Sequence, residues 1–91
     1  MIILVIDLSL PEPVEQYLNM LNALNSFDPT FVETKPMVVV GNKIDAVNAK
    51  ENLYLLKEQI NGAVVPVSTI EKINLRKLMK ILRDTYEQEI K

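Results

Sequence analysis

The chain of 91 residues contains no cysteine, no histidine and no tryptophan. Without cysteine it has neither a disulfide framework nor a thiolate nucleophile. Without histidine, the commonest general base and the usual zinc sites are excluded as well. Any chemistry must therefore depend on carboxylates, lysines, hydroxyls and backbone groups.

An excess of positive charge is also missing, since ten basic residues face twelve acidic ones and the formal net charge is -2. Such a balance does not gather a nucleic-acid backbone. The apolar run from Met1 to Ile6 is too short for a membrane span or a signal peptide, lacks a basic lead-in and ends at Asp7. With 48% hydrophobic residues, the chain is expected to be one soluble, intracellular domain with no membrane partner.

Three apolar runs without polar alternation predict strands that are covered on both faces, as in parallel sheets. They span residues 2–6, 37–40 and 63–67. A helix is expected at about residues 12–25, and the segment 25–36, rich in turn residues, should break it. A second helix is expected at residues 48–60. Asn48 and Glu51 suggest a capping box at its start, and Gly62 is expected to end it by adopting a left-handed backbone conformation.

The third expected helix is the clearest, because apolar residues recur in it at three- and four-residue steps. They are expected to pack in the core: Leu75, Leu78, Met79, Leu82, Tyr86 and Ile90. The element order is therefore strand, helix, strand, helix, strand, helix. This order predicts an α/β fold with a three-stranded parallel sheet and helices on both faces. Such a unit is half of a doubly wound, Rossmann-like domain, and residues 1–91 are expected to form one partial domain.

Ligands of open α/β sheets bind beyond the carboxyl ends of the strands. Polar clusters stand at all three predicted ends: Asp7-Leu8-Ser9, Gly41-Asn42-Lys43-Ile44-Asp45 and Ser68-Thr69. Asp7 is expected to cap the turn that follows it, because no glycine stands three positions on to make an Asp-x-x-Gly motif. Asn74 is expected to orient the last loop or to cap the third helix.

The stretches "NKID" and "VPVST" resemble the two guanine-specificity motifs of the GTPase superfamily, Asn-Lys-x-Asp and Ser-Ala-x. The order of elements is similar to the second half of that P-loop domain. Within the superfamily the chain most resembles the Obg family of translation-associated GTPases, through "LVIDLSLPEPVEQYLNMLNAL", "KPMVVVGNKID" and "VPVSTIEKINLRKLMKIL". The resemblance implies a GTP-binding segment of a GTP hydrolase involved in ribosome biogenesis.

A carboxylate such as Asp45 can accept both the N1-H and the 2-amino group of guanine, and adenine offers neither donor there. The resemblance implies further roles. Lys43 would lay its stem along the base, and Asn42 would tie the loop and approach the imidazole edge. Ser68 would steady Asp45, and the backbone N-H of Thr69, where Ala is usual, would donate to the guanine 6-oxo group.

The phosphate-binding loop Gly-x-x-x-x-Gly-Lys-Ser/Thr is absent from the sequence, because neither Gly41 nor Gly62 begins one. Residues 1–91 are therefore expected to hydrolyse no GTP and to bind it weakly or not at all. The cofactor would be GTP or GDP, with Mg²⁺ held only by the missing half of the domain. No catalytic residue and no metal ligand is assigned within the chain.

Two functional classes stay open on these grounds. The first is the guanine-recognition half of an Obg-like GTPase, with guanine nucleotide and, by resemblance, the large ribosomal subunit as partners. Its location would be cytoplasmic or organellar, such as mitochondrial. The second is a noncatalytic α/β interaction module whose exposed sheet edge pairs with another chain or self-associates. A receiver-like domain fits less well, because its acidic cluster would need more than Asp7.

Overall fold

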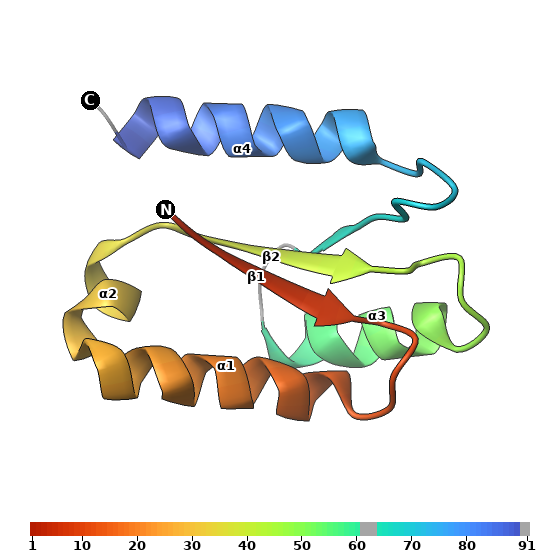
Figure 1. Ribbon diagram of the computed structural model, residues 1–91, viewed down its shortest axis with the longest axis horizontal. Helices are drawn as coiled ribbons and strands as arrows, with labels where there is room; N and C mark the ends of the chain where they lie inside the picture. The colour runs from red at the N-terminus through yellow and green to blue at the C-terminus, as the bar shows by residue number, and fades with distance from the viewer. Residues whose placement is uncertain (61–63, 90–91) are drawn as a thin grey trace.

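The computed structural model describes residues 1–60 and 64–89 and shows three layers (Figure 1). A sheet lies in the middle, α1 and α3 lie on one side of it, and α4 lies on the other. The predicted α/β fold is confirmed. The elements in chain order are β1 (Ile2–Asp7), α1 (Pro13–Phe27), α2 (Pro29–Thr34), β2 (Met37–Asn42), α3 (Ala49–Gln59), β3 (Val64–Pro66) and α4 (Leu75–Glu89).

The three strands run parallel in the order β1-β2-β3, so that each strand lies beside its neighbour in the sequence. Asp7 pairs with Asn42 at the end of the β1-β2 ladder, and Gly41 pairs with Pro66 in the β2-β3 ladder. This register places the polar segments that follow the three strands along one edge of the sheet.

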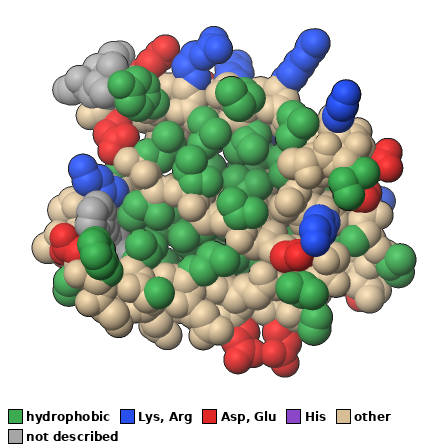
Figure 2. All heavy atoms as spheres, in the orientation of Figure 1, with side chains coloured by type: hydrophobic (Ala, Val, Ile, Leu, Met, Phe, Trp, Pro, Cys, Tyr) green, Lys and Arg blue, Asp and Glu red, His purple; other side chains and the backbone are tan. Residues whose placement is uncertain are grey.

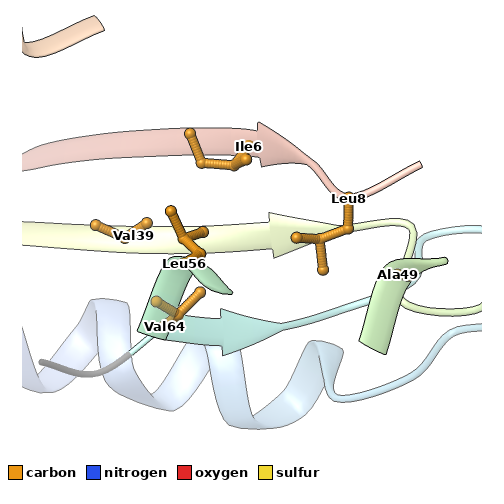
Figure 3. Close-up of a cluster of buried hydrophobic side chains, with 6 residues drawn as sticks. All are labelled: Ile6, Leu8, Val39, Ala49, Leu56 and Val64. Carbon is orange, nitrogen blue, oxygen red and sulfur yellow. The ribbon is translucent and has the colours of Figure 1, made fainter. Parts of the chain in front are cut away.

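The continuous apolar runs of β2 and β3 exist because alternate residues of these two strands enter two different hydrophobic clusters, whereas Ile6 of β1 belongs to the cluster on the α1 and α3 side. Residues on the α1 and α3 side interdigitate with Leu8, Ala49 and Leu56 (Figure 3), and complete burial of one leucine contributes about 1.5–3 kcal/mol. The cluster on that side consists of Ile6, Leu8, Val39, Ala49, Leu56 and Val64. On the other side, Val38, Val40, Val65 and Val67 pack against α4.

The inward stripe of α4 differs in part from the predicted one. Leu75, Leu78 and Leu82 pack against the sheet as expected, together with Ile81. Met79 and Tyr86, however, are 62% and 55% exposed, so their prediction as buried residues is wrong. The physical reason is the rotation of the helix, which the preceding loop sets and which periodicity alone does not fix. Ile90 lies outside the described residues.

The break predicted in the segment 25–36 is confirmed, but that segment also contains the short helix α2. α1 ends at Phe27, and Asp28 adopts an extended conformation. The Oδ1 atom of Asp28 accepts hydrogen bonds from the backbone N (3.0 Å) and Oγ1 (2.7 Å) of Thr30. Asp followed by Pro is a helix-start signal, which explains why a new helix begins at Pro29.

The predicted capping box of α3 is wrong in its detail. Asn48 stands at the N-cap, but its side chain makes no capping hydrogen bond. Its φ of -101° and ψ of 13° depart from the extended conformation that turns a capping oxygen back toward the helix. The predicted helix end at Gly62 lies outside the described residues.

β1 is an edge strand, and α4 leaves part of it uncovered. Ile3 and Val5, which lie on the α4 side of the sheet, are 45% and 49% exposed. Figure 2 shows hydrophobic side chains gathered on this face of the molecule, between the levels of α4 and α1. Within the described ranges, therefore, one apolar edge of the sheet lacks a covering element.

Candidate functional site

The candidate site lies at the carboxyl edge of the sheet, where backbone hydrogen bonds hold the three post-strand segments together. Leu8 N donates to Asn42 O at 3.0 Å, which joins the end of β1 to the end of β2. Val67 N donates to Gly41 O at 2.8 Å, and Ile44 N donates to Val67 O at 3.0 Å. The segments "NKID" and "VPVS" are thus brought directly side by side.

The loop that contains "NKID" is a tight turn with one strained residue. Lys43 has a φ of 65°, a left-handed conformation that costs about 1–2 kcal/mol for a residue with a Cβ atom. Ala46 N donates to Lys43 O at 2.9 Å and closes the turn. Asp45 is exposed, whereas Asn42 is half-buried. The Oδ1 atom of Asn42 is buried and has no hydrogen-bond partner among the described residues.

The loop after β3 is built around Ser68, whose exposed fraction is only 1%. Its Oγ accepts a hydrogen bond from Glu71 N at 3.0 Å, and its backbone pairs in antiparallel fashion with Ile73. Asn74 Nδ2 donates to Pro66 O at 2.9 Å, so the predicted role of Asn74 in orienting this loop is confirmed. Thr69 is exposed beside Ser68. The contact predicted between Ser68 and Asp45 stays a prediction.

Asp7 has two partners, of which the sequence predicted one. As expected, its Oδ1 caps the following turn by accepting hydrogen bonds from the backbone N (2.9 Å) and Oγ (2.6 Å) of Ser9. Its Oδ2 lies 3.0 Å from the Nζ atom of Lys43. The hydrogen bond from the Ser9 hydroxyl is the main cause that lowers the pKa of Asp7 below its ordinary value of 3.8; burial opposes it, and the Lys43 ammonium lowers the pKa further.

The ion pair was not foreseen, although one signal was available. Parallel strands end at one edge, so the residue that ends β1 and the residue that follows β2 must be neighbours. The sequence itself shows Asp7 and Lys43 only as residues 36 positions apart.

A second residue that the sequence did not single out is Asn52 on α3. Its exposed fraction is 9%, and its Nδ2 donates to Leu8 O at 2.8 Å and to Leu10 O at 3.1 Å. These bonds anchor the loop that follows Asp7. A buried side-chain amide of this kind resembles an ordinary exposed helix residue in the sequence.

The described part of the chain has neither a helix that could cross a membrane nor a cluster of side chains that could hold a metal ion. None of the helices within residues 1–60 and 64–89 has the length and apolar character needed to cross a membrane. In the same ranges, no group of three or more acidic side chains is placed to hold a metal ion.

Among known proteins, the chain is similar to GTPases of one name. No protein-family model matches the chain. GTPase Obg of Staphylococcus aureus strain bovine RF122 / ET3-1 is 35% identical over 79 residues, which cover 85% of this chain and 18% of that protein. GTPase Obg of strain MRSA252 matches with the same identity and coverage. The chain thus spans less than a fifth of the length of these curated relatives. Over most of its own length, the chain is therefore similar to a segment of these GTPases.

Proposed function

We propose that residues 1–91 are the guanine-recognition half of an Obg-like GTPase domain, in which two loops grip the base. The observation that carries the proposal is the hydrogen bond from Ile44 N to Val67 O at 3.0 Å. It holds Lys43 and Asp45, which flank Ile44, close to Ser68 and Thr69, which follow Val67. A two-loop base clamp requires this adjacency.

The side chains at this edge suit guanine better than adenine. Asp45 is an exposed carboxylate that can accept two hydrogen bonds, and guanine presents its N1-H and 2-amino donors side by side. A site that depends on such a pair can reject the analogue lacking it by about 10⁴-fold in favourable cases. The stem of Lys43 can cover one face of the base while its ammonium stays in water.

Asn42 supports the proposal from a different direction. Buried polar atoms in proteins nearly always have hydrogen-bond partners, yet Asn42 Oδ1 has none in the described part of the chain. A donor from a neighbouring segment of a complete domain would satisfy it. This agrees with the proposed role of Asn42 in tying the base-binding loop to its surroundings.

Phosphate and metal binding do not fit these residues. Phosphoryl transfer depends on phosphate-cradling backbone N-H groups, a lysine and Mg²⁺, and the sequence has no Gly-x-x-x-x-Gly-Lys-Ser/Thr. GTP or GDP would therefore be bound through the base by this chain and through its phosphates and Mg²⁺ by other residues. We expect the chain alone to show no GTP hydrolysis and no submicromolar, Mg²⁺-dependent GTP binding.

The experiment that tests the proposal replaces Asp45 with Asn and uses nuclear magnetic resonance. Amide shifts of the 91-residue chain are followed during titration with millimolar GMP, XMP and AMP. The unmodified chain should respond to GMP and not to AMP, with shifts centred on residues 41–45 and 67–69. Xanthine carries a 2-oxo group in place of the 2-amino group, so Asp45→Asn should prefer XMP. Asp84→Asn, an exposed carboxylate on α4, is the matched control.

Two results would contradict the proposal. One is a response of the unmodified chain to AMP that is as large as its response to GMP. The other is an Asp45→Asn variant that keeps the original preference for GMP over XMP.

By resemblance to the Obg family, we also propose a role in assembly of the large ribosomal subunit in the cytoplasm or an organelle. Co-sedimentation of the chain's parent protein with large subunits tests that role.

The uncovered edge of the sheet favours a second candidate function, a noncatalytic module that pairs with another chain or with itself. It rests on β1 as an edge strand and on the exposure of Ile3 and Val5, 45% and 49%. Sedimentation velocity over a range of concentrations tests self-association. A monomer at all concentrations that still binds GMP would favour the first function over this one.

A further inference from the structure

We propose that Asp7 is a positioning residue for guanine recognition, which holds Lys43 in the orientation that covers the base. The proposal rests on the proposed function and adds to it a residue from outside both specificity motifs. The observation behind it is the ion pair between Lys43 Nζ and Asp7 Oδ2 at 3.0 Å.

The Asp7 carboxylate is itself fixed, and only one of its oxygens is engaged by its own loop. Oδ1 accepts both hydrogen bonds from Ser9, at 2.9 and 2.6 Å, which leaves Oδ2 directed at Lys43. The backbone is held as well, because Gln16 Oε1 accepts from Asp7 N at 3.1 Å and Gln16 Nε2 donates to Asp7 O at 3.0 Å. Asp7 is therefore a rigid acceptor for a flexible cation.

Lys43 needs such an acceptor because its side chain is otherwise free to move. The lysine side chain is 48% exposed, and a lysine that becomes ordered loses up to about 2 kcal/mol of rotamer entropy. Its left-handed backbone, with φ at 65°, already sets where the side chain leaves the loop. The ion pair then fixes the far end of the side chain over the end of β1. Part of the rotamer entropy of Lys43 is therefore already lost in the free protein, so less is lost when the base binds.

The placement follows from the sheet. Asp7 and Asn42 are paired in the parallel register, and Lys43 is the next residue along the chain. An acidic residue at the end of β1 therefore lies beside the lysine and can reach across to it. Asp45, two residues after Lys43, is left to read the guanine donors.

The test is a double-mutant cycle on GMP binding by the 91-residue chain, with Asp7→Asn, Lys43→Met and the combination of both. An exposed ion pair contributes only a small free energy, so Asp7→Asn should weaken GMP binding by about two- to fivefold. The discrimination between GMP and AMP should stay, because Asp45 is unchanged. Once Lys43 is Met, Asp7→Asn should have no further effect. The difference in GMP affinity between the unmodified chain and the Asp7→Asn variant should also become smaller at about 1 M salt, where the screening length is about 3 Å.

Ser9→Ala is the matched structural control, since it removes one hydrogen bond to Oδ1 and leaves Oδ2 with Lys43. If Asp7 acts only by stabilising its own loop, Ser9→Ala should weaken GMP binding as much as Asp7→Asn does. That result, or additive effects of Asp7→Asn and Lys43→Met, would overturn the inference. A failure of the Asp45→Asn test would instead overturn the proposed function, so the two failures are distinguishable.

Discussion

Replacing Asn52 with Ala tests whether a buried side-chain amide holds the loop after β1 in place. Asn52 Nδ2 donates to Leu8 O at 2.8 Å and to Leu10 O at 3.1 Å, and the residue is only 9% exposed. Each hydrogen bond contributes about 0.5–1.5 kcal/mol, and a buried acceptor left unpaired costs about 1–3 kcal/mol. Since the Leu8 carbonyl is the buried one of the two, we expect Asn52→Ala to lower the free energy of unfolding by about 2–3 kcal/mol.

Urea unfolding monitored by circular dichroism measures this change. With a slope of about 1–2 kcal/mol per molar for a small domain, the midpoint should fall by about 1–3 M. Asn52→Asp keeps the size of the side chain but loses both amide donors, so it should be at least as destabilising as Asn52→Ala. Asn48→Ala is the control on the same helix, because Asn48 is exposed and makes no capping bond; its effect should stay within about 0.5 kcal/mol.

The reasoning would be refuted if Asn52→Ala and Asn48→Ala shifted the midpoint equally, or if Asn52→Asp were as stable as the unmodified chain. Either outcome would mean that the two carbonyls do not depend on the amide. Because Leu8 and Leu10 belong to the loop that follows Asp7, Asn52→Ala should also broaden the amide signals of residues 8–10.

Two further predictions concern packing and acid stability. A Cβ atom on Gly41 would lie 2.9 Å from Leu8 Cδ1, and Leu8 is completely buried. Gly41→Ala should therefore destabilise by about 1 kcal/mol net, since overpacking costs about 1–3 kcal/mol and alanine gains about 0.5–1 over glycine in a strand. The urea midpoint measures this change. If the double variant Gly41→Ala with Leu8→Ala loses less stability than the two single variants add up to, the contact with Leu8 is the cause. Hydrogen bonds from Thr30 lower the pKa of Asp28 below 3.8, so its stabilising effect is present above that pH and is lost as the pH falls below it. Asp28→Asn should thus make the unfolding midpoint less sensitive to pH between 5 and about 2, and an unchanged pH profile would count against this assignment.

The layer order and the location of the site were predictable because both follow from patterns that are local in the sequence. Apolar runs without alternation indicated buried parallel strands, and the carboxyl ends of such strands share one edge. This reasoning placed Asn42 and Ser68 at the same edge, where the structure also has them.

The parts that sequence reasoning missed depend on contacts between distant residues. The ion pair of Asp7 with Lys43 spans 36 positions, and the bond from Asn52 to Leu8 spans 44. Neither pair has a local signature. On α4, Ile81 packs against the sheet whereas Met79 is 62% exposed, and the spacing of apolar residues in the helix does not distinguish between the two.

The left-handed backbone of Lys43 means that folding and the proposed recognition of guanine make opposite demands on that position. Glycine adopts such a conformation without the steric penalty of about 1–2 kcal/mol, so it would relieve the turn. It would also remove the stem and the ammonium that Asp7 holds. Screening for thermal stability alone should therefore select residues at this position that would impair the proposed recognition of guanine.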